Sequence, residues 1–201
     1  MKRLPKEGPY ITISNHPTNV DGILLLKLML EQRSDFKLIA NFLFERVEPL
    51  KPHIIPVNPF DDHKEVQSSK KGFIISLRHL RNGHPLGIFP AGEVSTNKNG
   101  KFIVDKPWEV PAIKLVKNAQ VPIVPIFFEA RNSRLFYKFA NLNGSLRFAK
   151  LPSEYLTHKR RIIKVRIGNP ISVKDQQEHK SLDDFSEFIR NKTYILANAI
   201  D

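Results

Sequence analysis

The sequence predicts an α/β fold, with a mostly parallel central sheet flanked by helices. Short apolar runs that suit buried strands alternate along the chain with segments whose apolar residues recur at helical spacing. Gly and Pro separate these segments, and strands that alternate with helices are typical of a parallel sheet. At 201 residues, with no repeat or long linker, the chain is expected to form a single domain over residues 1–201.

The sequence up to Arg81 predicts three strands and two helices. The run YITIS alternates apolar and polar residues, and an amphipathic run begins after the next polar turn. The longest apolar run, ILLLKLML, is interrupted by Lys27 and is too short for a membrane span. The expected strands are Tyr10–Ser14, Phe36–Phe42 and His53–Val57, and the expected helices are Gly22–Gln32 and His63–Arg81.

The sequence from Leu86 onward predicts three more strands and three more helices. Trp108, preceded by Pro107, suits a packed helix start, and membrane-interface contact is the alternative for this Trp. Ser181 and Asp184 have the spacing of a capping box that begins the last helix. The expected strands are Leu86–Phe89, Val121–Glu129 and Ile162–Ile167, and the expected helices are Trp108–Asn118, Arg134–Asn141 and Leu182–Ala199.

Composition excludes some chemistry and suggests partners. The chain has no Cys, which excludes disulfides, thiolate metal sites and Cys nucleophiles. The N-terminal MKRLPKEGPY lacks the apolar core of a signal peptide. The formal net charge of +12 would attract nucleic acid, an anionic membrane surface or an acidic carrier protein. A basic, solvated surface without a partner is the alternative.

Three polar loops follow three of the expected strands. They are SNHPTNVD after the first strand, PAGEVS after the fourth and EARNS after the fifth. In a parallel sheet, functional residues gather in loops beyond the carboxyl ends of the strands. We therefore expect these three loops to converge on one edge of the sheet and to form the functional site.

The first of these loops places His16 five residues before Asp21. A carboxylate that holds imidazole Nδ1 leaves Nε2 free as a base and stabilises the imidazolium that forms. The alternative is structural, with Asp21 or Asn19 capping the next helix while His16 fills a turn. His179 and Asp184 have the same spacing, and the capping-box pattern there indicates a structural role, so spacing alone is weak evidence.

Three motifs in order resemble the glycerolipid acyltransferase superfamily, typified by lysophosphatidate acyltransferases. SNHPTNVD resembles its NHxxxxD block, FPAGEVS its FPEGTRS block, and VPIVP its VPxxP block. IGNPIS is similar to its late strand and Gly-x-Pro turn. FPAGEVS, followed by NKNGKFIVDKPW and FEARNSRLFYKFANL, looks closest to the hemolysin-like branch, which includes ornithine and glycine lipid O-acyltransferases.

The resemblance implies acyl transfer from acyl-carrier protein or acyl-CoA to a lysolipid hydroxyl, with no cofactor and no metal. His16 would be the base and Asp21 its orienting acid. Gly92 would bring backbone N–H donors near the oxyanion. The substrate-binding residues that it implies are Asn15, Pro90, Ala91, Gly92, Glu93, Ser95, Arg131, Asn132 and Ser133.

Departures from the family pattern bear on the acceptor. Two Arg residues suited to the phosphate of lysophosphatidate are replaced, with Val94 at one position and Asn58 nearest the other. An isolated Glu93 carboxylate would repel a phosphomonoester. These features favour an aminoacyl lipid or a lysophospholipid with a blocked phosphate. Lysophosphatidate itself stays an alternative, because Arg131 could replace the missing cations.

Two of the implied binding residues also have structural alternatives. Arg131 could form an ion pair with Glu129 or Glu93 rather than contact substrate. Asn132 and Ser133 precede an apolar helical pattern, so an N-cap is the favoured interpretation for them.

Other functions are less well supported. A nucleic-acid-binding module would need a basic helix or an aromatic basic sheet, and the sequence shows neither a ribonucleoprotein-like signature nor a clear Lys/Arg stripe on a helix. A metal-dependent hydrolase could use His16, Asp21, Asp61, Asp62 and His63, although acids before a helix usually cap it.

The resemblance and the charge also suggest where the protein acts. The basic segment His158–Arg166 would face solvent, and it could dock to anionic lipid or to an acidic carrier. The N-terminal membrane-associating segment of the superfamily is expected to be short or absent. A cytoplasmic protein, peripheral on the inner face of the cell membrane, is the expected localisation.

Overall fold

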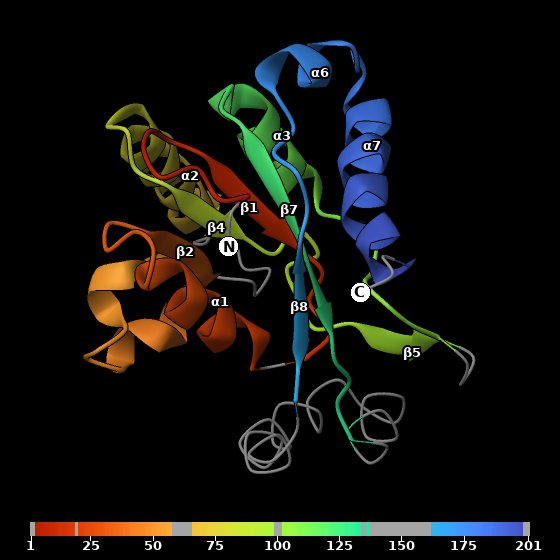
Figure 1. Cartoon of the computed structure of the whole chain (residues 1–201). Coiled ribbons are helices and arrows are strands. Elements are labelled where there is room, and N and C mark those ends of the chain that lie inside the picture. The colour runs from red at the N-terminus through yellow and green to blue at the C-terminus, as the bar shows by residue number, and fades with distance from the viewer. Residues whose placement is uncertain are drawn as a thin grey trace.

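The computed structural model contains a six-stranded mixed sheet, and Figure 1 shows most of its strands in order across the view. It describes residues 3–18, 20–57, 66–98, 102–133, 136 and 162–198. The strand order is β3-β2-β4-β1-β7-β8. All neighbours are parallel except β7 and β8, so the predicted mostly parallel α/β sheet is confirmed.

The six predicted strands are present with boundaries shifted by at most two residues. They are β1 (Ile11–Ser14), β2 (Lys37–Asn41), β3 (Ile54–Val57), β4 (Leu86–Ile88), β7 (Ile123–Glu129) and β8 (Lys164–Ile167). Strand β1 lies between β4 and β7, with Ile13 beside both Ile88 and Pro125. Gly87 allows this close packing, because a Cβ there would lie 2.6 Å from the Phe36 ring and 2.9 Å from Leu38.

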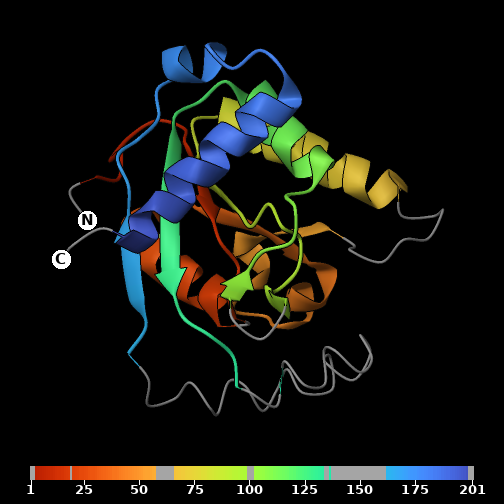
Figure 2. The same cartoon turned by 90° about the vertical axis from the view of Figure 1, so that its right-hand side faces the viewer.

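Helices cover both faces of the sheet. Helices α2 (Val66–Arg81), α3 (Val110–Ala119) and α7 (Leu182–Tyr194) contribute to one apolar cluster. Figure 2 shows α7 and α3 on the same side of β7. Helix α1 (Asp21–Leu30) packs on the opposite face with Leu25, Leu26 and Met29 in a second cluster. Because alternate strand residues point to opposite faces, Ile11 and Ile13 join the first cluster, while Val124 and Ile126 join the second.

Several short elements were not predicted from sequence. They are the 3-10 helices η1 (Phe42–Arg46), η2 (Lys51–His53) and η3 (Ile195–Asn198), the strands β5 (Thr96–Lys98) and β6 (Phe102–Val104), and α6 (Val173–Gln177). The predicted helix over Arg134–Asn141 lies outside the described residues except for Phe136. Among the described helices, none is both long and apolar enough to cross a bilayer.

An ion-pair network joins turns at the amino edge of the sheet, opposite the edge where the polar loops leave. Arg33 donates to both carboxylate oxygens of Asp35, at 2.9 and 2.7 Å. His84 Nδ1 lies 2.7 Å from Asp35 Oδ2, and Arg33 also donates to the carbonyl of Gly8. The Arg33 hydrogen bond, opposed in part by burial, lowers the pKa of Asp35 from 3.8 to about 2. The network therefore depends on an ionised Asp35.

We expect Asp35→Asn to lower the free energy of unfolding at pH 7 by about 1–2 kcal/mol, because a charge-assisted bidentate pair is lost. Since the folded pKa lies below the unfolded value, this contribution is present above pH 3.8 and is lost as the pH falls through about 2. Urea unfolding of both proteins between pH 7 and pH 2 would measure it. Glu48→Gln, at an exposed pair, is the control. An Asp35 effect independent of pH would contradict this account.

Candidate active site

Contacts join the first two polar loops at the carboxyl edge of the sheet, toward which the arrowheads of the parallel strands point in Figure 1, and the third loop follows β7 at the same edge. The backbone N–H of Ser95, after β4, donates to the carbonyl of His16, after β1, at 2.7 Å. Asn15 bonds to the backbone of Phe128, near the end of β7. The first two loops are in direct contact, as predicted. The third loop follows β7, and β7 is hydrogen-bonded to the first loop through Asn15.

His16 and Asp21 form a close side-chain pair. Imidazole Nδ1 lies 2.9 Å from Asp21 Oδ1 and 3.0 Å from Oδ2. The carboxylate also accepts hydrogen bonds from the backbone N–H groups of Thr18 (3.0 Å) and Gly22 (2.8 Å). With Nδ1 held by the carboxylate, Nε2 is the ring nitrogen left for proton transfer. The pair thus has the geometry of a general base with its orienting acid.

Asp21 also begins helix α1. The N-cap residue is Val20, whose side chain makes no capping bond, and Asn19 lies outside the described residues. Asp21 occupies the first helical turn, where the helix dipole stabilises a negative charge. Asp21 therefore both supports the turn and pairs with His16, two roles that were predicted from the sequence as alternatives.

The surroundings of His16 favour its protonated form. Burial alone would lower the pKa of His16, but the Asp21 carboxylate raises it, and Asp105 and Glu93 raise it further. The net pKa lies above the ordinary value of 6.5. The His16 ring stacks on Phe89, with ring centroids 4.5 Å apart. These contacts fix the ring and stabilise the imidazolium that proton removal from a substrate would create.

The second His-Asp pair of the sequence shows why spacing is insufficient. His179 Nδ1 lies 3.0 Å from Asp184 Oδ1, so this pair also forms. The Asp184 side chain is 54% exposed, whereas that of Asp21 is fully buried. Ser181 Oγ accepts from the Asp184 backbone N–H at 3.0 Å, which confirms the predicted N-cap of the last helix. Burial and neighbouring acids, rather than the local pairing, distinguish His16.

A small hairpin holds the backbone of His16. Strands β5 and β6 pair antiparallel with Thr96 opposite Val104, so Ser95 and Asp105 meet at the base of the hairpin. Asp105 Oδ1 accepts from the His16 backbone N–H at 3.0 Å and lies 2.5 Å from Ser95 Oγ. Together with the Ser95 N–H bond to the His16 carbonyl, both backbone polar groups of His16 are fixed.

Asp105 is itself buried and supported by aromatic and cationic neighbours. Its Oδ2 accepts from Trp108 Nε1 at 3.2 Å, and its backbone N–H donates to the Tyr194 hydroxyl at 3.1 Å. Arg190 donates to the carbonyls of Asp105 and Lys106 and lies over the Trp108 and Tyr194 rings. Trp108 is buried, so the packing interpretation is confirmed and the membrane-interface alternative is wrong. Helix α7 thereby supports the hairpin through Arg190 and Tyr194.

The first half of the PAGE loop is packed into the protein. Pro90 and Ala91 are buried, and the Pro90 carbonyl accepts from the Glu109 backbone N–H at 2.8 Å. Gly92 has φ of +69°, a conformation that side chains disfavour, and its N–H donates to the Phe89 carbonyl. Glu93 forms an ion pair with Lys106, so it is not the isolated carboxylate that the sequence suggested. This correction brings a cation beside the loop.

Asn15 has a structural partner. Its Nδ2 donates to the Phe128 carbonyl at 3.0 Å, and its Oδ1 accepts from the Phe128 N–H at 2.7 Å. The side chain is buried and continues the ladder between β1 and β7. A substrate contact through these amide atoms would require these bonds to break.

The third loop is described over Arg131, Asn132 and Ser133. Arg131 is exposed, Asn132 is buried, and Ser133 Oγ accepts from the Phe136 N–H at 3.2 Å, the spacing of an N-cap. The carboxylates proposed as Arg131 partners are paired elsewhere, because Glu129 binds Arg166 and Glu93 binds Lys106. Contact of Arg131, Asn132 or Ser133 with substrate stays a prediction.

The alternative sites have little support within the described chain. Those residues contain no group of three His, Cys, Asp or Glu side chains that could hold a metal ion, and Asp61, Asp62, His63 and Asn58 lie outside them. Of the predicted basic segment, only residues 162–166 are described. There the apolar Ile162 is exposed and Arg166 is partly buried against Glu129, contrary to the expected pattern.

Sequence reasoning missed Asp105, Lys106, Arg190 and Tyr194. The one available signal was Asn99-Gly100, a dipeptide typical of hairpin turns, between the segments that form β5 and β6. That signal predicts the hairpin but not the proximity of Asp105 to His16, which lie 89 residues apart in sequence.

The chain is similar in sequence and in fold to known proteins. A model of the acyltransferase family matches residues 1–201. A lyso-glycine lipid O-acyltransferase of Bacteroides thetaiotaomicron is 26% identical, over 98% of this chain and 73% of that protein. A protein of the same name from Phocaeicola vulgatus is 25% identical, over 98% and 71%. The crystal structure of the 1-acyl-sn-glycerophosphate acyltransferase PlsC from Thermotoga maritima shares the fold, with a TM-score of 0.61, 15% identity, and 98% and 68% coverage.

We expect Asp105→Asn to lower the pKa of His16, because a negative charge that favours the imidazolium is removed. An NMR titration of the His16 ring would measure the shift, and the midpoint should move to lower pH. Asp184→Asn, at the exposed His-Asp pair, should leave the His16 titration unchanged. A His16 midpoint unaffected by Asp105→Asn in a folded variant would contradict the electrostatic role of Asp105.

Proposed function

The chain belongs to the acyltransferase family, and on that premise we propose that it transfers a fatty acyl group from a thioester to a hydroxyl of a lysolipid. The observation that carries this proposal is the buried His16–Asp21 pair at the carboxyl edge of the sheet. The names of the two curated relatives support a lysolipid acceptor. The reaction would be an O-acyl transfer in membrane lipid biosynthesis.

The residues of the site support direct transfer. His16 Nε2 removes the acceptor proton as the hydroxyl oxygen attacks the thioester carbonyl, and Asp21 stabilises the resulting imidazolium. The tetrahedral intermediate then expels the thiolate, which takes the proton from His16 and leaves as a thiol. One ester bond forms and one thioester bond breaks. Backbone N–H groups of the turn around Gly92, other than that of Gly92 itself, which donates to Phe89, are the proposed donors to the oxyanion.

The proposed acceptor class is a lysolipid with an anionic head group, such as a monoacylated glycine lipid. The two relatives named as lyso-glycine lipid O-acyltransferases support this choice. Val94 supports it as well, because it stands at the position where lysophosphatidate acyltransferases have an Arg. The exposed Arg131 after β7 is a cation available to a carboxylate head group, whereas Lys106 is paired with Glu93. Binding through Asn132 and Ser133 is part of the same proposal, whereas the predicted substrate residue Ser95 is buried and bonded to His16 and Asp105.

We expect His16→Ala to reduce acyl transfer by about 10³-fold and Asp21→Asn by about 10²-fold or more, because the base is lost or misoriented. The assay presents labelled acyl-carrier protein and acyl-CoA with lysophosphatidate, lysophosphatidylethanolamine, and monoacylated glycine and ornithine lipids. His179→Ala, at the exposed pair, is the matched control and should keep its activity.

Each outcome of this assay decides a different part of the proposal. Product with aminoacyl lipids that depends on His16 would support the acceptor and the base. A preference for lysophosphatidate would keep the base and reject the acceptor. Activity that survives His16→Ala in the folded protein would reject the site.

The proposal includes a peripheral position on an anionic membrane, at the cytoplasmic face. Ile23, Leu43, Val104 and Val110 are exposed, and each lies in or beside a segment at the carboxyl edge of the sheet. An apolar rim around the site suits contact with the bilayer that holds the acceptor.

We expect Leu43→Ser combined with Val110→Ser to weaken sedimentation with vesicles that contain anionic lipid, because both changes remove apolar side chains from this rim. Ile195→Ser, an exposed Ile on η3, is the control. Equal sedimentation of all three proteins would contradict membrane contact through this edge.

A further inference from the structure

The outer face of α2 carries cations and apolar side chains that the proposed reaction does not use. Lys70, Lys71, Arg78 and Arg81 are exposed, as are Ile74 (56%) and Ile75 (45%). Their spacing of three, four and seven residues places them on one side of the helix, while Phe73, Leu77 and Leu80 pack inward. We call these six exposed residues the α2 face. This is a Lys/Arg stripe that was not predicted from the sequence, because only burial distinguishes the exposed residues of α2 from those that pack inward.

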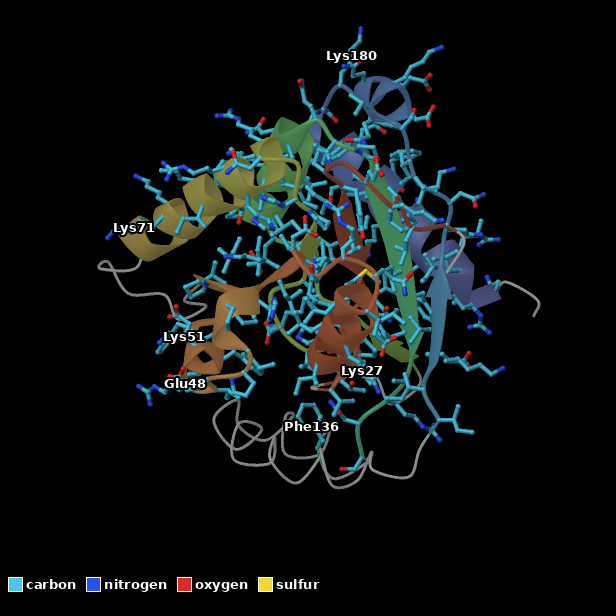
Figure 3. The ribbon with its side chains drawn as sticks, turned by 60° about the vertical axis from the view of Figure 1, so that its left-hand side comes forward. Lys27, Glu48, Lys51, Lys71, Phe136 and Lys180 are labelled. Atoms are coloured by element: carbon cyan, nitrogen blue, oxygen red, sulfur yellow. The ribbon has the colours of Figure 1, made fainter. Side chains whose placement is uncertain are left out.

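The α2 face is positively charged throughout. No Asp or Glu occurs in α2, and among the described residues no carboxylate pairs with its four cations. Figure 3 shows Lys71 extending from the helix away from the protein. Two adjacent isoleucines framed by cations form a surface suited to an acidic partner that also offers apolar side chains.

The α2 face begins at the edge of the sheet that holds the active site. Gly72 packs against Pro56 and Val57, at the carboxyl end of β3, so the first turns of α2 lie at that edge. Strand β3 is three strands away from β1, which His16 follows, a lateral spacing of about 14 Å. From Lys70 to Arg81 the face extends about 16 Å away from the edge. A partner bound there would lie beside the site without covering it.

The neighbouring helices argue for a protein rather than a bilayer on this face. Helix α3 contacts both α2 and α7 in the layer that covers this side of the sheet. The exposed residues of α7 include Asp183, Asp184 and Glu187. A flat anionic membrane laid on the layer would meet these carboxylates, whereas a small acidic protein can cover α2 alone.

We infer that the α2 face docks an acidic carrier protein that delivers the acyl thioester on its flexible prosthetic arm, an inference that rests on the proposed function. The arm of such a carrier has to span the lateral spacing of about 14 Å from β3 to β1. The lysolipid then enters from the apolar rim at the sheet edge, and the donor approaches from the aqueous side. Cations at the α2 face attract the carrier, and Ile74 and Ile75 give it an apolar contact.

The test compares Lys71→Glu/Arg78→Glu with Lys174→Glu/Lys180→Glu, which makes the same change in net charge at exposed sites on and after α6. Both are measured with one acyl group presented on acyl-carrier protein and on N-acetylcysteamine, a neutral donor. We expect the α2 variant to raise KM for the carrier-bound donor by about tenfold or more, with kcat and use of the neutral donor unchanged. The control pair should match the unmodified protein.

Direct binding separates failure of docking from failure of the proposed function. Calorimetry with carrier protein and His16→Ala, with and without the α2 changes, needs no turnover. We expect binding that weakens with salt and with the α2 changes. Three results would overturn the inference: no carrier binding, an equal loss with both donors, or lost vesicle sedimentation with carrier binding intact. Carrier binding without acyl transfer from any donor would instead reject the proposed function.

Discussion

The buried carboxylate of Asp21 is the constraint on which the site depends. It has no exposure to solvent, and an unpaired charge in such a place would cost several kcal/mol. Its negative charge is satisfied by His16, by the backbone N–H groups of Thr18 and Gly22, and by the start of α1. The turn between β1 and α1 therefore folds around the carboxylate. The same contacts fix the tautomer and position of the imidazole, so the stability of the turn and the orientation of the proposed base have one origin.

A second structure, remote in sequence, holds the other side of His16. The hairpin from Ser95 to Asp105 binds both backbone polar groups of His16, and Arg190 and Trp108 support the hairpin in turn. His16, the proposed base, is thus held by its side chain from α1 and by its backbone from the hairpin. Rigid support of this kind keeps a reacting group in place before substrate arrives, which lowers the cost of reaching the transition state.

The net positive charge is unevenly distributed over the described surface. Four cations without an acid occupy the outer side of α2, whereas three carboxylates occupy that of α7. Apolar side chains border the carboxyl edge of the sheet between these regions and the site. The apolar edge and the α2 face suit the two different partners that we propose for the site. On that proposal, a membrane-held acceptor and a water-soluble donor approach His16 without competing for the same contacts.

The sequence by itself determined the elements of the sheet, the position of the polar loops after β1, β4 and β7, and the His16–Asp21 pair, because periodicity and short spacings are local properties. It could not separate this pair from His179–Asp184, because both pairs form and only packing buries one of them. Nor could it predict that Asn15 contacts Phe128, that Glu93 contacts Lys106, or that Asp105 contacts His16. These contacts depend on which segments the folded sheet brings together, and that arrangement was decided by the tertiary structure.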